Sequence, residues 1–172
     1  KILITINEED YNYARNKLFK PIPIFKINGV GLNIKKKLII KNKKKINKII
    51  VIGAYKKSKG YMDVLKVAEQ LKKRGIKLDC YGYGDFNKFR KIKLKKNLTN
   101  LGFKNFDFKL KDKLKNYDVL LHLSKREGLP VSVMECLSAG LPVICYNIRG
   151  NNDLIVDNYN GFFVSTYKSI PN

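Results

Sequence analysis

Short apolar runs alternate with amphipathic stretches through residues 49–164, and this alternation limits the folds that the chain can adopt. The apolar runs that predict strands are residues 49–53, 77–82, 98–103, 118–123, 142–146 and 161–164. The stretches that predict helices are residues 61–71, 87–96, 108–116 and 130–139. Because helices between consecutive strands give right-handed crossovers, the pattern predicts an α/β fold with a doubly wound parallel sheet.

The first part of the chain is organised differently. Residues 1–7 predict a strand, and residues 8–17 predict a short helix whose acidic first turn complements the helix dipole. Pro21 and Pro23 exclude a helix in the stretch that follows. This part therefore reads as a strand, a helix and an extended connection.

A boundary is predicted near residue 33. Gly29 and Gly31 permit a sharp backbone turn, and residues 35–48 then carry eight Lys and no acidic residue. Such a stretch is typical of a solvated connector. We therefore divide the chain into residues 1–33, a small leading segment with a hinge, and residues 34–172, the main domain.

The net charge of +22 comes entirely from the first two thirds of the chain, because residues 117–172 carry four basic and five acidic side chains. A basic field attracts phosphates, nucleic acid or anionic lipid. However, 31 of the 36 basic residues are Lys, whereas nucleic-acid binders favour Arg and interleaved aromatic residues. We favour a compositional bias, and keep a membrane contact through residues 35–48, or a nucleic-acid module using 35–48 and 88–96, as alternatives.

Several classes of protein are excluded by the sequence. Cys80, Cys136 and Cys145 have no paired spacing, and with His122 as the one histidine they provide neither a zinc site nor a disulfide framework. No apolar run approaches the length of about 18 residues that a membrane span needs. The chain begins without Met or the pattern of a signal peptide, so we expect a cytoplasmic segment of a longer protein.

The loop after the fourth predicted strand is the strongest candidate for a binding site. It carries Glu127, and Glu135 follows eight positions later in the next predicted helix. The free amides of Gly128, Leu129 and Val131 at the start of that helix suit an anion such as a diphosphate. The two carboxylates could accept hydrogen bonds from sugar hydroxyls. From spacing alone, they could equally be surface residues at a helix terminus.

Residues 127–164 resemble the signature of the retaining nucleotide-sugar glycosyltransferases of the GT-B fold, family 4 (glycosyl transferases group 1). The shared features are the Glu-x7-Glu pair, Gly-Leu-Pro-Val at 140–143, Gly150, and Asn-Gly at 160–161. Residues 149–155 are similar to bacterial capsule and exopolysaccharide members. Weaker upstream matches are Gly-Val-Gly at 29–31, Gly53 with Lys59-Gly60, and Gly-Tyr-Gly-Asp at 82–85.

The resemblance implies roles for particular residues. Glu135 would bind the ribose hydroxyls of the nucleotide, and Glu127 would contact the donor sugar. Lys59 would neutralise the diphosphate and assist the leaving group, which makes Lys59 and Glu127 the expected catalytic residues. The loop at Gly102 and Phe103 would meet the base through its backbone. The further positions implied to line the donor are Gly53, Gly128, Leu129, Pro130 and Val131.

One departure from the family concerns the phosphate. The family usually has Arg directly after the Gly of the first strand, and this chain has Ala54. A planar bidentate clamp is therefore missing, and Lys56 or Lys57 could compensate only as point charges.

No metal or cofactor is expected. The chain has no Asp-x-Asp motif that would link a divalent ion to the diphosphate, and His122 lies in an apolar run where packing is the favoured interpretation. A position at the end of a strand leaves His122 a minor role at the site. The leaving charge would then be stabilised by Lys59 and a helix N-terminus.

Taken as a whole, the resemblance implies the donor-binding, Rossmann-like C-terminal half of an enzyme of bacterial surface polysaccharide synthesis. It would transfer a sugar, with retention, from a nucleotide-sugar (a UDP-sugar) to a glycan or lipid-linked acceptor, at the inner face of the membrane. Residues 1–33 would be the end of an N-terminal domain that holds the acceptor, so we expect the isolated chain to be inactive. A nucleotide-sugar-binding domain without turnover is the remaining alternative.

Overall fold

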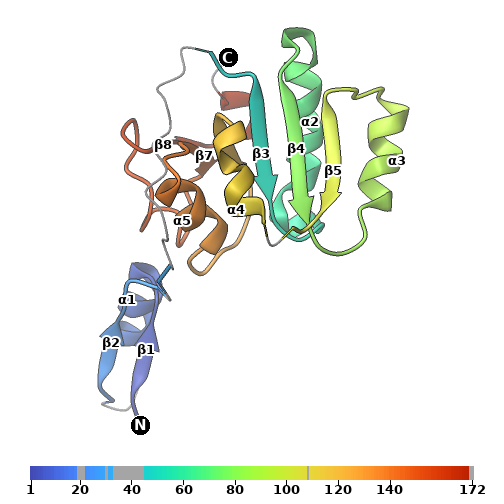
Figure 1. Cartoon of the computed structure of the whole chain (residues 1–172). Coiled ribbons are helices and arrows are strands. Elements are labelled where there is room, and N and C mark those ends of the chain that lie inside the picture. The colour runs from blue at the N-terminus through green and yellow to red at the C-terminus, as the bar shows by residue number, and fades with distance from the viewer. Residues whose placement is uncertain (19–21, 30, 33–44, 108, 171–172) are drawn as a thin grey trace.

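The computed structural model describes residues 1–18, 22–29, 31–32, 45–107 and 109–170. Its main sheet has six parallel strands in the order β5-β4-β3-β6-β7-β8 (Figure 1). The strands are β3 (Lys48–Ile52), β4 (Lys77–Gly82), β5 (Leu101–Asn105), β6 (Val119–His122), β7 (Val143–Tyr146) and β8 (Gly161–Val164). The predicted α/β fold with a parallel sheet is therefore confirmed.

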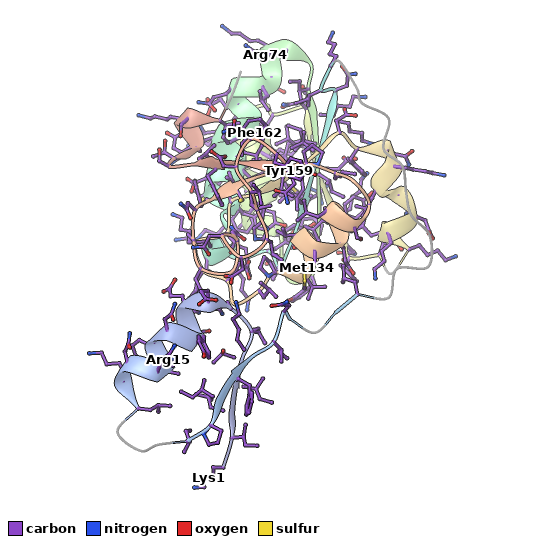
Figure 2. All side chains as sticks on the ribbon, turned by 90° about the vertical axis from the view of Figure 1, so that its left-hand side faces the viewer. Lys1, Arg15, Arg74, Met134, Tyr159 and Phe162 are labelled. Carbon is purple, nitrogen blue, oxygen red and sulfur yellow. The ribbon has the colours of Figure 1, made fainter. Side chains whose placement is uncertain are left out.

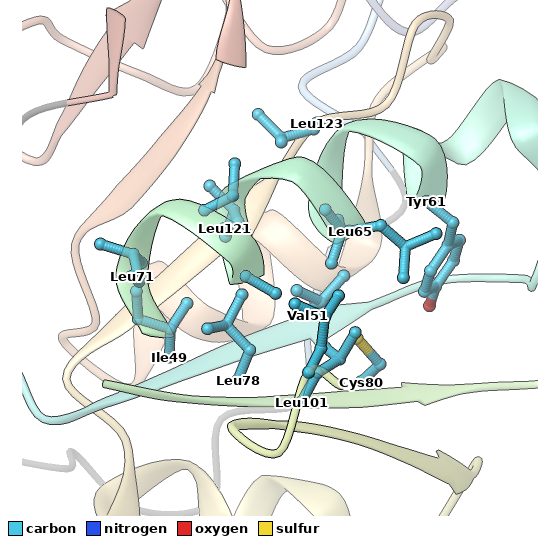
Figure 3. Packing of buried hydrophobic residues seen from close by; sticks show 14 of the residues in the cluster. Ile49, Val51, Tyr61, Leu65, Leu71, Leu78, Cys80, Leu101, Leu121 and Leu123 are labelled. Carbon is cyan, nitrogen blue, oxygen red and sulfur yellow. The ribbon is translucent and has the colours of Figure 1, made fainter. Parts of the chain in front are cut away.

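Helices cover both faces of this sheet. The helices are α2 (Tyr61–Leu71), α3 (Asn87–Lys95), α4 (Leu110–Lys113) and α5 (Val131–Ser138), with short 3-10 turns η1 (Lys57–Lys59), η2 (Lys72–Arg74), η3 (Leu114–Asn116) and η4 (Tyr167–Ser169). Alternate residues of the central strands point to opposite faces: Ile49 and Val51 join the α2 and α3 layer, whereas Ile50 and Ile52 join the α4 and α5 layer (Figure 3). Each such fully buried side chain contributes about 1.5–3 kcal/mol.

The prediction for the third strand was wrong by three residues. Residues 98–103 were expected to form it, but β5 begins at Leu101. Leu98 instead closes α3: its amide donates to the carbonyl of Lys93, and Asn97 before it has a φ of 50°. In this type of helix end, an apolar residue after the left-handed position packs back onto the helix, which explains why Leu98 is 1% exposed.

The predicted helix over 108–116 is also only partly present. The described residues form α4 and then η3, so the single helix is a short turn of α-helix followed by a 3-10 turn. Most of the Lys-rich stretch over 35–48 lies outside the described residues.

The leading segment forms a separate two-stranded parallel sheet. β1 (Leu3–Thr5) pairs with β2 (Ile24–Lys26), and α1 (Glu8–Lys17) connects them. β2 was missed because Pro23 directly before it suggested an irregular connection. The division at residue 33 stays a prediction.

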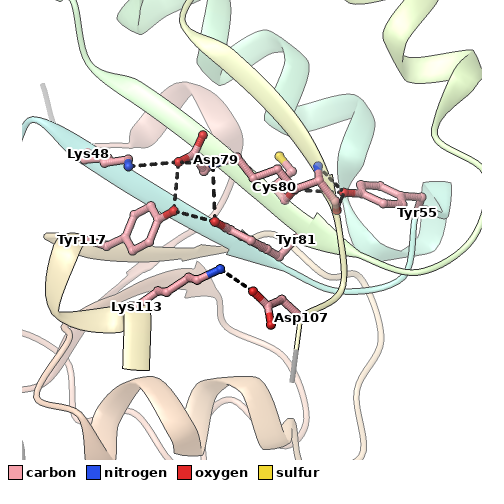
Figure 4. A network of polar contacts seen from close by, with 9 residues as sticks. Lys48, Tyr55, Asp79, Cys80, Tyr81, Asp107, Lys113 and Tyr117 are labelled. Carbon is pink, nitrogen blue, oxygen red and sulfur yellow. Dashed lines mark hydrogen bonds and ion pairs between the residues drawn. The ribbon is translucent and has the colours of Figure 1, made fainter. Parts of the chain in front are cut away.

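A polar network occupies the α4 side of the sheet. The carboxylate of Asp79 in β4 pairs with Lys48 at 3.1 Å and Lys104 at 3.0 Å, and accepts a hydrogen bond from the Tyr117 hydroxyl at 2.8 Å (Figure 4). Burial disfavours the charged form, but these donors hold the pKa of Asp79 below its usual value. The network ties together the three strands on one side of the site.

Two exclusions made from the sequence have counterparts in the fold. Cys80, Cys136 and Cys145 are free and buried, as predicted. Within the described residues, no helix has the length and apolar character needed to cross a membrane.

Candidate functional site

Lys59 and Glu127, which lie 68 positions apart in the sequence, meet at the carboxyl ends of β3 and β6. Nζ of Lys59 donates to Oε1 of Glu127 at 2.7 Å. Nε2 of His122, the last residue of β6, lies 3.4 Å from the same oxygen. At that distance the His122 contact is electrostatic, and this buried nitrogen has no hydrogen-bond partner among the described residues. The two predicted catalytic residues are thus neighbours, with a histidine beside them.

Lys59 reaches this position because η1 is docked on the end of β6. Gly60 has a φ of +77°, and a β-carbon there would lie 1.9 Å from the carbonyl oxygen of Leu123. The amide of Lys125 donates to the carbonyl of Ser58 at 2.9 Å. The Lys-Gly pair therefore turns the backbone sharply where it crosses the end of the neighbouring strand.

The charge of Glu127 is stabilised by its surroundings. Its side chain is 11% exposed, and burial alone would raise its pKa. The nitrogens of His122 and Lys59 lower the pKa of Glu127 to about 2. Glu127 is therefore a carboxylate throughout the physiological range, able to accept hydrogen bonds or balance a cation.

This lowered pKa makes part of the stability depend on pH. The folded pKa of Glu127 is about 2 against 4.5 for the free group. The stabilisation, about 3 kcal/mol by linkage, should be present above pH 4.5 and be lost as the pH falls through 2. We expect urea unfolding to show wild type more stable than Glu127→Gln by a constant amount between pH 5 and 7, with the gap closing below pH 4.5. A gap that is unchanged at pH 3 would contradict this.

The loop that follows Glu127 presents free backbone amides. Pro130 is the N-cap of α5, and the first helical amides that are bonded, those of Val133 and Met134, donate to its carbonyl. Within the described part of the chain, the amides of Gly128, Leu129 and Val131 donate no hydrogen bond. The predicted free amides are thus present, and their role in binding an anion stays a prediction.

Glu135 lies further along α5 and has a partner that the sequence did not indicate. Its Oε1 is 3.0 Å from Nζ of Lys111 on α4, and both side chains retain access to solvent. A ligand hydroxyl could therefore reach the Glu135 carboxylate. A role for Glu135 in ribose binding stays a prediction.

Gly102 and Phe103 were expected in the loop after the third strand, and this location was wrong. Both lie inside β5, paired with Asp79 and Cys80 of β4. Phe103 packs against the ring of Tyr55 at 5.8 Å, so its side chain belongs to an aromatic cluster. The loop at this strand end begins only at Phe106, because the start of β5 is shifted along the chain.

Gly53 lies where β3 leaves the sheet. Its amide donates to Tyr81 at 3.0 Å, and its carbonyl accepts from the Tyr61 hydroxyl at 2.9 Å. Ala54 is 4% exposed, whereas Lys56, the N-cap of η1, and Lys57, its first residue, are exposed and close in sequence to Lys59. Compensation by these two lysines for the missing Arg stays a prediction.

Two further observations concern metal binding and the location of the site. Among the residues that the structure describes, no three His, Cys, Asp or Glu side chains are grouped as a metal site would require. An apolar cavity of about 680 Å³ lies at the other, amino-terminal ends of the strands, lined by residues that include Ile49, Val119 and Pro142. It does not touch Lys59 or Glu127, so we place the site by its chemistry and not by cavity size.

Comparison with known proteins identifies the family of the chain. The family model of glycosyl transferases group 1 matches residues 33–170. An Escherichia coli UDP-Gal:alpha-D-GlcNAc-diphosphoundecaprenol alpha-1,3-galactosyltransferase is 40% identical over 73 residues, which are 42% of this chain and 18% of the relative. The putative glycosyltransferase EpsD of Bacillus subtilis is 26% identical over 178 residues, covering 94% of this chain and 47% of the relative.

A solved structure shows the same fold. A mutant of S. aureus TarM, in complex with fondaparinux, alpha-GlcNAc-glycerol and UDP, superimposes with a TM-score of 0.81 at 24% identity. The match covers 95% of this chain and 33% of the TarM chain. The chain therefore spans less than half the length of each of these proteins.

Proposed function

This chain belongs to the glycosyl transferases group 1 family, and from this membership we propose that it binds the nucleotide-sugar donor of a retaining glycosyltransferase of family 4. The observation that carries the proposal is the contact between Lys59 and Glu127 beside the free amides that precede α5. A cation, a carboxylate and unpaired amides at one sheet edge match the diphosphate, the sugar hydroxyls and the phosphate oxygens of such a donor.

The proposed roles follow from these contacts. Glu127 accepts hydrogen bonds from the sugar, and Glu135 accepts them from the ribose after the exposed Lys111 moves aside. When the donor enters, the Lys59 ammonium leaves the Glu127 carboxylate and pairs with the diphosphate. The C1–O bond of the donor then breaks and its electron pair goes to the diphosphate, while an acceptor hydroxyl bonds to C1 from the same face and gives its proton to the departing phosphate oxygen. Lys59 with the loop amides stabilises the charge on the diphosphate.

We propose that the donor is a UDP-sugar and the product a bacterial surface glycan. The E. coli relative carries UDP-Gal in its name, and TarM was solved with UDP. The exopolysaccharide type rests on the resemblance of residues 149–155 to bacterial capsule and exopolysaccharide members. The acceptor, a glycan or lipid-linked sugar, would bind against residues 1–33 and the remainder of an N-terminal domain, facing the cytoplasm.

A thermal-shift panel of UDP-, GDP- and ADP-sugars tests the donor class directly. A ligand present at 100 times its Kd should add about 2.7 kcal/mol to the free energy of unfolding. We expect the UDP series to raise the melting temperature most. An equal response to all three bases, or none, would contradict the proposed function.

Glu135 provides a test of the ribose contact. Replacing Glu135 with Ala should weaken UDP binding by about 1.5–3 kcal/mol, the range for a hydrogen bond to a charged group. Glu69→Ala is the matched control, because Glu69 also pairs with a lysine, Lys96, but on the exposed surface of α2. Calorimetric titration with UDP measures both variants. Equal affinities would remove Glu135 from the site.

We also propose that donor binding does not depend on a divalent metal. The diphosphate charge would be balanced by Lys59 and the loop amides, so EDTA should leave the Kd for UDP within about twofold, a change below about 0.5 kcal/mol. Added Mg²⁺ or Mn²⁺ should have as little effect. Binding that appears only with metal would contradict the roles given to Lys59 and Gly128.

A further inference from the structure

The loop that carries Glu127 is bound from outside by two other parts of the chain. Its carbonyl oxygens at Glu127 and Gly128 both accept hydrogen bonds from side chains more than 20 positions away. One donor lies in the connection after β7 and the other at the start of α1. Figure 2 shows where the N-terminal segment meets the main domain, close to Met134.

Arg149 is the first of these donors. Its Nε donates to the Glu127 carbonyl at 3.1 Å, and its Nη1 donates to Oδ1 of Asp10 on α1 at 2.6 Å. The side chain is 28% exposed. The guanidinium therefore joins α1 and the Glu127 loop with two nitrogens of one rigid plane, a geometry that Lys cannot reproduce.

Asn7 is the second donor and is fully buried. It caps α1 by accepting the Asp10 amide at 2.8 Å, and its Nδ2 donates both to Oδ2 of Asp10 at 2.8 Å and to the Gly128 carbonyl at 3.2 Å. The two oxygens of the Asp10 carboxylate thus serve Arg149 and Asn7, so one residue of α1 organises both contacts with the loop.

Close packing leaves the loop little freedom. A β-carbon on Gly150 would lie 2.0 Å from the Gly128 carbonyl oxygen, and one on Gly29 would lie 2.5 Å from Cδ2 of Leu129. The loop is therefore enclosed by the connection after β7 on one side and by the segment after β2 on another. A shift of either would move the backbone that carries Glu127.

We propose that Arg149 and Asp10 are positioning residues, which hold the Glu127 backbone so that its carboxylate meets Lys59 and, once the donor is bound, the sugar. This inference rests on the proposed function for the identity of the ligand. It makes the donor site depend on the position of α1, because the Asp10 carboxylate accepts hydrogen bonds from both side chains that hold the loop.

A direct contact of Arg149 with the diphosphate is the competing interpretation, and Arg149→Lys separates the two. A phosphate contact would weaken UDP and the UDP-sugar by similar factors in Arg149→Lys, because both ligands carry the diphosphate and Lys keeps the charge but not the bidentate geometry. The positioning role needs two nitrogens in a plane, so Lys should fail. Asp10→Ala separates the two interpretations further. If Arg149 binds phosphate, loss of Asp10 should leave the guanidinium free to do so. If Arg149 positions the loop, loss of Asp10 should release the loop.

The binding experiment compares UDP with UDP-GlcNAc and UDP-galactose by calorimetry. In the positioning role, Arg149→Lys and Asp10→Ala should each weaken binding of the preferred UDP-sugar about tenfold and that of UDP by a smaller factor of about two to three, because UDP meets only the loop amides whereas the sugar also contacts Glu127. The double variant should be no weaker than either single one, since both break one bridge. Glu9→Ala, in the same turn of α1 and without a side-chain partner in the described structure, is the control. Retention of affinity by Arg149→Lys would overturn the proposal.

Hydrogen exchange without nucleotide gives a second, independent measurement. The amides of Val133 and Met134, which donate to the Pro130 carbonyl where the loop joins α5, should exchange about tenfold faster in Arg149→Lys and Asp10→Ala than in wild type or Glu9→Ala, while those of α3 stay unchanged. Unchanged exchange in both variants would overturn the positioning role. If wild type bound no UDP or UDP-sugar, the proposed function would fail, and the exchange rates would still decide whether Arg149 and Asp10 hold the loop.

Discussion

Gly60→Ala should lower the free energy of unfolding by about 4 kcal/mol, a loss large enough to unfold many domains of this size. The left-handed φ of +77° costs an L-residue about 1–2 kcal/mol. The remainder comes from the Leu123 carbonyl oxygen, which would lie 1.9 Å from the new β-carbon. Because that oxygen belongs to backbone at the end of β6, the strand or η1 must move.

Gly75→Ala measures the conformational contribution without the clash. Gly75 has a similar φ of +66°, but a β-carbon there would meet nothing within 4 Å. It should therefore cost only about 1 kcal/mol, the conformational part. Urea unfolding of both variants gives the difference directly. Equal losses would mean that η1 does not pack on the end of β6 as described, and the position of Lys59 would then lose its support.

The sequence predicted the elements whose signals are local. β4 and β8 have the expected bounds, because apolar runs between glycines or charged residues define buried strands without help from elsewhere. The strand-end loops were also the predicted place of the site, since the carboxyl ends of parallel strands lie at one edge, whereas the part of Lys59 came from the family resemblance and its contact with Glu127 from the structure.

Other features could not be read from local pattern. Leu98 has the apolar character of a strand residue, and only the left-handed Asn97 before it makes it a helix end. The contacts from Asp10 to Arg149 and from Asn7 to Gly128 join residues 139 and 121 positions apart. The sequence spacing of neither pair predicts the contact, although Arg149 and Gly150 lie within the stretch that resembles the family signature.

For His122, the local sequence pattern favoured packing, whereas the structure also places the side chain beside Glu127. Its place in an apolar run favoured packing, and the side chain is indeed only 5% exposed. Yet its Nε2 points to Oε1 of Glu127, because His122 ends β6 at the edge where the loops gather. The position of His122 at the end of a strand, which had left it a minor role at the site, was the signal for this contact.

In the proposed glycosyltransferase, Lys59→Met should lower kcat about 100- to 1,000-fold, the usual cost of removing one group that stabilises developing charge. Met keeps much of the side-chain length while removing the charge. Since the Nζ of Lys59 bonds to Glu127 before the donor binds, the pair already places the cation at the site. The loss should appear in kcat more than in the KM for the donor, because the charge on the diphosphate grows as the C1–O bond breaks.

Lys72→Met is the matched control, because Lys72 is an exposed lysine of another 3-10 turn, η2, at the opposite end of α2. It should leave kcat unchanged. A radiolabelled UDP-sugar assay measures transfer by both variants, and Lys59→Arg should recover part of the rate because it restores the charge. Full activity of Lys59→Met would show that the leaving group is stabilised elsewhere, by the amides before α5 or by Lys56 and Lys57. The Lys59–Glu127 contact would then be a structural ion pair with no part in the reaction.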